Sequence, residues 1–121
     1  MENRIKILYV DDEEINLMLF KYNFSDKYEI ITSDCGSGGL ECLKKHPEIK
    51  VVISDMKMPN MTGLDFIAKA KEQYSDIRYY ILTGFDINDE IISALKNKLI
   101  LKYFRKPLNI KEIQEAINEV I

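Results

Sequence analysis

Short apolar runs alternate with segments of helical periodicity along the whole sequence, and this alternation limits the possible folds more than any other feature. Residues 5–10 are almost continuously apolar, which is typical of a strand that is covered on both faces. Shorter runs predict four more strands, at 28–32, 51–53, 78–83 and 99–104. Apolar spacing of three and four residues predicts helices at 14–24, 36–45, 64–74, 88–97 and 109–120. Five strand–helix repeats indicate an α/β fold, with a parallel sheet between two helical layers.

The first and the last predicted helices each carry apolar side chains at helical spacing. The segment 14–24 has four of them at helical spacing, namely Ile15, Met18, Leu19 and Tyr22. The segment 109–120 has one apolar stripe, formed by Ile110, Ile113, Ile117 and Val120. Asn109 comes directly before this stripe and is a suitable N-cap. The last segment is therefore the clearest helix of the chain.

Polar side chains follow the predicted strands, and those after four of the five are expected to share one site; Ser33 and Asp34, after the second strand, belong nearer the outer edge of the sheet. Asp11 and Asp12 follow the first strand, Asp55 follows the third, Thr83 ends the fourth and Lys106 follows the fifth. In a doubly covered parallel sheet, ligands bind where the carboxyl ends of the strands meet. The sequence therefore predicts that three carboxylates, one hydroxyl and one ammonium group share one edge of the sheet.

Three carboxylates at one place cannot all stay ionised without a cation. Two carboxylates ~4 Å apart repel by about 4 kcal/mol at an effective dielectric constant near 20, and each raises the pKa of the other. Oxygen ligands with room for water suit Mg²⁺, so Asp11, Asp12 and Asp55 are candidate metal ligands. A metal, Lys106 and the Thr83 hydroxyl around one carboxylate can hold three phosphoryl oxygens. That carboxylate can itself be the nucleophile that forms an aspartyl phosphate.

This ordered set of motifs resembles the receiver domain of two-component response regulators, and the resemblance covers the whole chain. The matching pieces are Val10-Asp11-Asp12-Glu13, Asp55-Met56-Lys57-Met58-Pro59 with Gly63, Thr83-Gly84 and Lys106-Pro107. The resemblance implies a single receiver domain over residues 1–121. It also implies a flavodoxin-like, doubly wound sheet with the strand order 2-1-3-4-5.

The resemblance implies a role for each carboxylate. Asp55 would be the phosphoacceptor, taking a phosphoryl group from a histidine kinase or a phosphotransfer protein. Asp12 would bind Mg²⁺ (or Mn²⁺) directly and Asp11 would bind it through water, with Asp55 as a further ligand. Lys57 would offer the metal its backbone carbonyl and not its side chain.

The resemblance also implies a switch. Thr83 and Lys106 would hold phosphoryl oxygens, and the movement of Thr83 would let the aromatic ring of Tyr103 turn inward. The added phosphoryl charge would shift the equilibrium between two conformations of the domain. It would reshape a face made of residues 88–97, 99–104 and 109–120, through which the chain could bind a partner or form a homodimer.

The sequence departs from the family pattern in three places. Gly84 stands where the family usually has alanine, which gives the loop more freedom. Phe85 lies two residues after Thr83, where its bulk is expected to obstruct water from the phosphoryl group. A Gly-Ala turn is absent before the last strand, and residues 96–100 replace it, so the pattern does not fix the end of the preceding helix.

Two alternatives remain open. Phosphatases of the haloacid dehalogenase type also use a nucleophilic aspartate and Mg²⁺, but there the nucleophile comes first and a second aspartate follows two residues later. Here the acidic pair comes first, and Lys57 stands two residues after Asp55. We therefore expect at most self-phosphorylation and self-dephosphorylation, without turnover of a separate substrate. The second alternative is a receiver-like interaction module that is never phosphorylated, although both Asp55 and Lys106 are intact.

The charge composition of the chain argues against some classes of binding partner. The chain has 17 lysine and arginine residues against 20 aspartate and glutamate residues, so its formal net charge is −3. This balance disfavours a dedicated surface for nucleic acid or anionic membranes. No apolar run approaches the roughly 20 residues of a membrane-spanning helix, and the N-terminus lacks a signal-peptide pattern. Cys35 and Cys42 form no metal-ligand pattern and suit a reducing compartment, so we expect a cytoplasmic domain.

Overall fold

The computed structural model describes residues 4–84 and 87–120. Five strands form one parallel sheet in the order β2-β1-β3-β4-β5. They are β1 (Lys6–Val10), β2 (Glu29–Ser33), β3 (Ile49–Asp55), β4 (Arg78–Thr83) and β5 (Lys102–Arg105). The helices are α1 (Glu14–Phe24), α2 (Gly36–Lys45), α3 (Gly63–Gln73), α4 (Asp89–Lys96) and α5 (Ile110–Val120). This arrangement confirms the predicted fold class and strand order.

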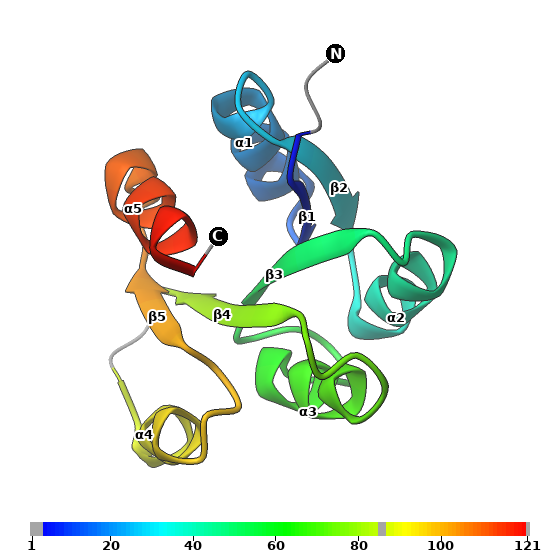
Figure 1. Cartoon of the computed structure of the whole chain (residues 1–121). Helices are drawn as coiled ribbons and strands as arrows, with labels where there is room; N and C mark the ends of the chain where they lie inside the picture. The colour runs from blue at the N-terminus through cyan, green and yellow to red at the C-terminus, as the bar shows by residue number, and fades with distance from the viewer. Residues whose placement is uncertain (1–3, 85–86, 121) are drawn as a thin grey trace.

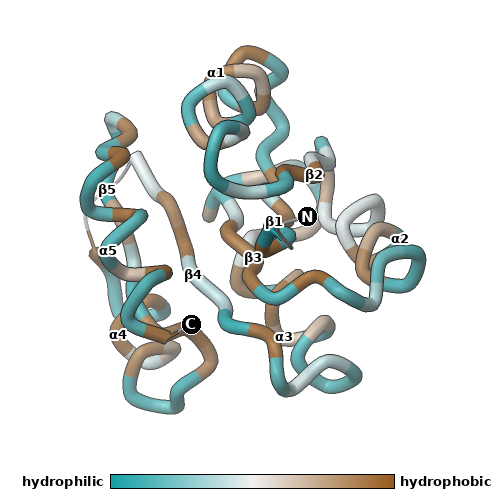
Figure 2. Tube along the Cα trace, turned by 45° about the horizontal axis from the view of Figure 1, so that its top comes forward, coloured by the Kyte–Doolittle hydropathy of each residue, from teal (hydrophilic) through white to brown (hydrophobic). Residues whose placement is uncertain are grey.

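The sheet separates two hydrophobic cores. Helices α1 and α5 cover one face of the sheet, and α2, α3 and α4 cover the other (Figure 1). Within β1, Ile7 and Tyr9 pack toward α1 and α5, whereas Leu8 and Val10 pack toward the other three helices. Brown and teal alternate along the helices in Figure 2, as expected of elements with one side on the sheet and the other in water. The carboxyl ends of the central strands are thus fixed by packing on both faces.

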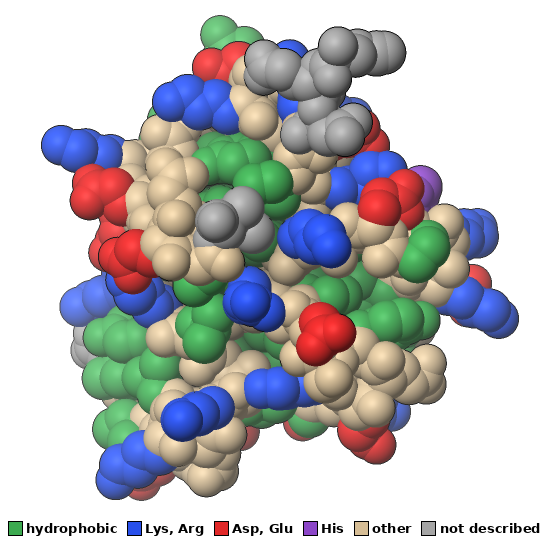
Figure 3. Space-filling model, in the orientation of Figure 1, with side chains coloured by type: hydrophobic (Ala, Val, Ile, Leu, Met, Phe, Trp, Pro, Cys, Tyr) green, Lys and Arg blue, Asp and Glu red, His purple; other side chains and the backbone are tan. Residues whose placement is uncertain are grey.

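The surface carries charges of both signs. Lysine and arginine side chains are interspersed with aspartate and glutamate over the face shown in Figure 3, and hydrophobic side chains are visible between them. The small negative net charge is therefore not gathered into one acidic area on this face. None of the described helices is both long and apolar enough to cross a bilayer.

Helix α1 turns a different side to the sheet from the apolar set noted in its sequence. Ile15, Met18, Leu19 and Tyr22 are exposed, with Tyr22 at 84%. Phe20 and Phe24 are buried instead. The Phe20 ring stacks on the Tyr9 ring of β1, with 4.1 Å between the ring centroids. Aromatic packing therefore decides which side of α1 is buried, because apolar residues lie on most sides of this helix.

Helix α4 ends without the glycine that usually terminates such a helix. Lys98 adopts a left-handed backbone conformation with φ of 61°. The Lys98 N–H donates to the Leu95 carbonyl at 3.2 Å, and the Leu99 N–H donates to the Ala94 carbonyl at 2.9 Å. These two bonds form a Schellman motif. The motif ends at Leu99, the first residue of the predicted last strand, and β5 begins only at Lys102.

Lys98→Gly is expected to stabilise the protein by about 0.5 to 1 kcal/mol. A left-handed conformation costs an L-residue roughly 1–2 kcal/mol, and the greater freedom of glycine in the unfolded chain offsets part of that gain. Urea unfolding measures the change. Lys96→Gly, inside the last turn of α4, is the matched control and is expected to cost about 1 kcal/mol. Equal losses in both variants would contradict this account of the helix end.

Candidate functional site

Three carboxylates meet at the carboxyl ends of β1 and β3. One oxygen atom from each of Asp11, Asp12 and Asp55 lies within 4.8 Å of the other two. Asp11 follows β1 and is fully buried, whereas Asp55 is the last residue of β3 and is 6% exposed. Asp12 is exposed. The structure thus brings together the three side chains that the sequence proposed as metal ligands.

Lys106 places a positive charge between two of these carboxylates. Its Nζ lies 3.3 Å from Asp11 Oδ2 and 3.3 Å from Asp55 Oδ1. Its backbone N–H donates to the Thr83 carbonyl at 2.8 Å, which ties the loop after β5 to the end of β4. Burial acts to lower the pKa of Lys106, but the carboxylates of Asp55 and Asp11 outweigh it and raise the pKa above the ordinary value. The ammonium group is therefore charged throughout the neutral range.

Asp55 carries a charge that Lys106 compensates only in part. Burial raises the pKa of the Asp55 carboxyl to about 6, Lys106 opposes the rise, and the neighbouring Asp11 carboxylate adds to it. A divalent cation among the three carboxylates would supply the missing positive charge. The donor set fits Mg²⁺ or Mn²⁺, because all three side chains offer oxygen and the exposed Asp12 leaves room for water ligands.

The Asp11 carboxylate is held at both of its oxygens. Oδ1 accepts the Glu13 N–H at 3.0 Å, and Oδ2 accepts the Tyr9 hydroxyl at 2.7 Å as well as facing Lys106. Burial and the hydrogen bond to Asp11 raise the pKa of the Tyr9 hydroxyl far above its ordinary value, so the hydroxyl keeps its proton. Sequence reasoning missed Tyr9; its one signal is a polar atom inside an otherwise apolar strand, two residues before Asp11.

The loop after β3 closes tightly on Asp55. The Gly63 N–H donates to the Met56 carbonyl at 2.8 Å. A Cβ atom at Gly63 would lie 2.2 Å from the Asp55 carbonyl oxygen, so no larger residue fits without a backbone shift. Thr62 caps α3 directly after this contact, in a reciprocal capping box with Asp65. Gly63 thus sets the path of the chain next to Asp55.

The remaining predicted residues lie around this cluster. Thr83 is the last residue of β4 and is 1% exposed. Tyr103 of β5 is paired with Ile81 and half-buried against the core on the side of α2, α3 and α4. Lys57 is exposed directly after the Asp55-Met56 pair, and the use of its carbonyl as a ligand stays a prediction. The expectation for Phe85 lies outside the described residues.

The chain is similar to known proteins of one family. The family model for the response regulator receiver domain matches residues 7–118. The chain is 27% identical to a chemotaxis protein CheY homolog of Campylobacter jejuni, covering 97% of this chain and 92% of that protein. It is 30% identical to sporulation initiation phosphotransferase F of Bacillus subtilis, with 96% and 93% covered. By contrast, it spans 22% of the hydrogenase transcriptional regulatory protein HoxA of Cupriavidus necator, at 23% identity over 88% of this chain.

Solved structures show the same fold. A response regulator receiver domain protein from Clostridium thermocellum superposes with a TM-score of 0.90 at 34% identity, covering 97% of this chain and 94% of that one. The response regulator protein TrrA from Thermotoga maritima, solved in complex with Mg²⁺-BeF, gives a TM-score of 0.83 at 26% identity, with 97% and 99% covered. From the family match over most of its length, the chain belongs to the response regulator receiver domain family.

Proposed function

We propose that this receiver domain takes a phosphoryl group onto Asp55, with Mg²⁺ or Mn²⁺ held by Asp11, Asp12 and Asp55. The observation that carries the proposal is the nearly buried Asp55 carboxylate, which has the Lys106 ammonium group at 3.3 Å and two more carboxylates within 4.8 Å. Receiver domains of two-component systems interact with histidine kinases or phosphotransfer proteins, and we assign this chain a donor of that kind. Its free, half-buried Cys35 and Cys42 support a location in the cytoplasm.

The reaction is a transfer between two nucleophiles. An Asp55 oxygen attacks phosphorus, the bond from phosphorus to the donor's histidine nitrogen breaks, and that nitrogen keeps the electron pair. When bound, the divalent cation neutralises charge on the phosphoryl oxygens. Lys106 supplies the second positive charge, since its ammonium group already lies beside Asp55. We assign the third phosphoryl oxygen to the hydroxyl of Thr83, because this residue ends the neighbouring strand β4.

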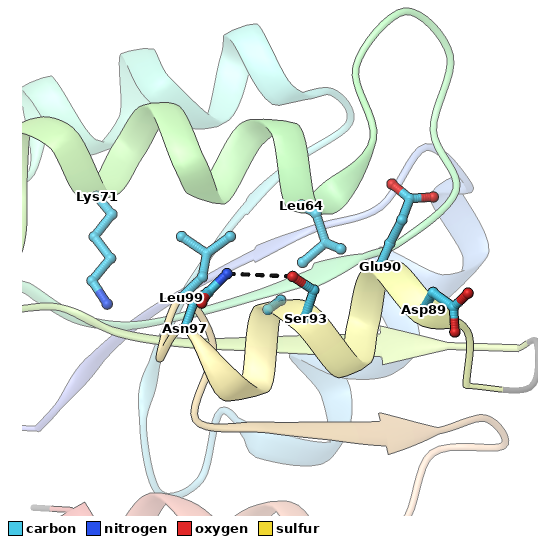
Figure 4. Close-up of a pocket in the computed structure, with 8 residues that line it drawn as sticks. Leu64, Lys71, Asp89, Glu90, Ser93, Asn97 and Leu99 are labelled. Atoms are coloured by element: carbon cyan, nitrogen blue, oxygen red, sulfur yellow. Dashed lines mark hydrogen bonds between the residues drawn. The ribbon is translucent and has the colours of Figure 1, made fainter.

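The surroundings of α4 support a switch that runs from Thr83 to Tyr103. A pocket of about 640 Å³ separates α4 from α3, and Figure 4 shows side chains of both helices on its walls. Of the eight residues of α4, only Ile91 and Ala94 are buried. A short helix with a small buried area and free space beside it can change position at little cost. Tyr103 already packs against the core on the side of α2, α3 and α4. We propose that its inward movement repositions α4.

A homodimer through α4, β5 and α5 is the second part of the proposal. Ile92, in α4, and Leu101, directly before β5, are exposed at 37% and 42%. We expect faster sedimentation with a beryllofluoride phosphoryl analogue and Mg²⁺ than without them. Ile92→Lys is expected to abolish that difference without affecting phosphorylation. Equal sedimentation of the wild type under both conditions would contradict dimerisation.

Acetyl phosphate tests the proposed function without a known donor protein. With Mg²⁺ present, the intact mass of the wild type is expected to rise by one phosphoryl group. A chelator is expected to abolish the rise, and Asp55→Ala is expected to show none. If the wild type gains no mass from acetyl phosphate and none from a phosphorylated histidine donor, the interaction-module alternative replaces this proposal. Rapid multiple turnover of a small phosphate ester would instead favour the phosphatase alternative.

A further inference from the structure

Tyr9 is a tyrosine in the interior of the sheet whose hydroxyl reaches Asp11, one of the three carboxylates of the candidate metal site. It is 1% exposed, and its ring stacks on Phe20 with an interplanar angle of 11°. The stack fixes the plane of the ring, and with it the position of the hydroxyl. The hydroxyl oxygen lies 2.7 Å from Asp11 Oδ2, which is the geometry of a strong hydrogen bond to a carboxylate.

The Asp11 carboxylate has no exposed surface, so its donors come from the protein. The Glu13 N–H holds Oδ1 at 3.0 Å, and the Tyr9 hydroxyl holds Oδ2. One donor on each oxygen fixes the orientation of the carboxylate plane. Lys106 also reaches Oδ2, but it lies at 3.3 Å and divides its charge equally between Asp11 and Asp55.

In the proposed reaction, the Tyr9 hydroxyl has a role that a charged donor could not fill. In the proposed reaction Lys106 would bind a phosphoryl oxygen on Asp55, and its ammonium group would then be withdrawn from Asp11. Asp11 Oδ2 then loses its charged partner, and the Tyr9 hydroxyl remains as its donor. A second lysine at this position would repel Mg²⁺, whereas the tyrosine hydroxyl adds no net charge to the site.

From this geometry we propose that Tyr9 is a positioning residue of the phosphorylation site. Its hydroxyl orients Asp11 toward the divalent cation and keeps Asp11 hydrogen-bonded when Lys106 moves to the phosphoryl group. This inference rests on the proposed function, because it assigns Tyr9 to the same metal site.

Tyr9→Phe tests the inference, because it keeps the aromatic stack and removes only the hydroxyl. Outer partners of metal ligands are commonly worth 10- to 100-fold in metal affinity, so we expect the Mg²⁺ affinity of the unphosphorylated protein to fall by about tenfold. Isothermal titration calorimetry measures this affinity without any phosphoryl transfer. The rate of phosphorylation by acetyl phosphate at sub-saturating Mg²⁺ is expected to fall by a similar factor.

Tyr79→Phe is the matched control. Tyr79 is an equally buried tyrosine whose hydroxyl donates to the Tyr74 carbonyl at 2.8 Å, in the core on the other face of the sheet. This variant loses one buried hydrogen bond but touches none of the carboxylates. We expect its Mg²⁺ affinity to equal that of the wild type. The same loss of affinity in both variants would overturn the inference.

Further comparisons separate the possible failures. In an Asp11→Asn background, Tyr9→Phe is expected to cause no further loss of Mg²⁺ affinity, and an additive loss would overturn the inference. If Tyr9→Phe folds poorly, Asp11→Asn in the same chain is expected to restore its melting temperature, because the buried charge that lost its donor is gone. A melting temperature that is not restored would count against the contact. If the wild type binds Mg²⁺ and is phosphorylated, and Tyr9→Phe has the same Mg²⁺ affinity and phosphorylation rate, only the inference about Tyr9 fails. If the wild type neither binds Mg²⁺ nor is phosphorylated, the proposed function fails as well.

Discussion

Asp55→Asn is expected to make the metal-free protein more stable at neutral pH while removing its ability to accept a phosphoryl group. In the folded protein the pKa of Asp55 rises from its ordinary value of 3.8 to about 6, chiefly because of burial. A shift of about two units corresponds to about 3 kcal/mol of cost for holding the ionised group in the folded state. Asparagine carries no charge at any pH. We therefore expect a gain on the order of 2 kcal/mol in the free energy of unfolding at pH 7 with a chelator present.

The raised pKa of Asp55 also determines how the stability of the wild type changes with pH. Between pH 3.8 and about 6 the folded protein binds more protons at Asp55 than the unfolded chain does. The contribution of this group to stability is therefore largest at acid pH, falls as the pH rises through that window, and stays low above it. The stability difference between Asp55→Asn and the wild type should grow across the same window. Urea unfolding at a series of pH values measures it.

A surface aspartate and added Mg²⁺ serve as controls for this prediction. Asp76→Asn, at an exposed position between α3 and β4, is expected to change stability by less than about 0.5 kcal/mol. Saturating Mg²⁺ is expected to stabilise the wild type more than Asp55→Asn, since the cation binds the folded site and compensates the charge. An Asp55→Asn variant that is less stable than the wild type in chelator at pH 7 would contradict the account of Asp55.

Gly63→Ala is expected to be the most damaging methyl addition near the site. The new Cβ would lie 2.2 Å from the Asp55 carbonyl oxygen and 2.9 Å from Ile81 Cδ1. The isoleucine side chain can turn away, but the carbonyl belongs to the backbone of β3 and cannot move without disturbing Asp55. Overpacking of this kind costs roughly 1–3 kcal/mol and occasionally more, and we expect about 3 kcal/mol here. Phosphorylation by acetyl phosphate should slow as well, because the shift displaces the phosphoacceptor.

Gly84→Ala is the matched control for this prediction. Among the described residues, a Cβ at Gly84 would meet the Lys106 Cδ atom alone, at an ordinary contact distance of 3.8 Å. The residue is exposed, and its backbone has no positive φ angle. We expect its free energy of unfolding to stay within about 0.5 kcal/mol of the wild type. Thermal unfolding of both variants measures the difference. Equal melting temperatures of Gly63→Ala and Gly84→Ala would contradict the prediction, because they would mean that the loop accommodates the added methyl group without cost.

The sequence was sufficient to predict which side chains meet in the candidate site, because the fold obeys a general rule. Asp11, Asp55 and Thr83 end or follow neighbouring strands, and parallel strands with helical crossovers bring their carboxyl ends to one edge. The last helix was equally predictable. Asn109 accepts the Glu112 N–H at 3.0 Å as an N-cap, and α5 begins at the next residue.

The features that sequence reasoning missed depend on tertiary packing, on backbone conformation or on side-chain rotamers. Which side of α1 is buried depends on the stacking of Phe20 on Tyr9, and the helix itself has apolar residues on several sides. The start of β5 depends on Lys98 in a left-handed conformation, which lysine adopts too seldom for a pattern to predict. The contact of Tyr9 with Asp11 depends on a rotamer that only a packed core determines.

Reductive trapping of the phosphorylated protein tests the central claim most directly. After incubation with acetyl phosphate and Mg²⁺, borohydride reduces an acyl phosphate to a primary alcohol, so an aspartyl phosphate becomes homoserine. Tandem mass spectrometry of the peptides then locates the reduced residue. The account predicts homoserine at position 55 alone, and none when Mg²⁺ is removed by a chelator. Homoserine at any other aspartate, or a phosphorylated protein with Asp55 unreduced, would contradict it.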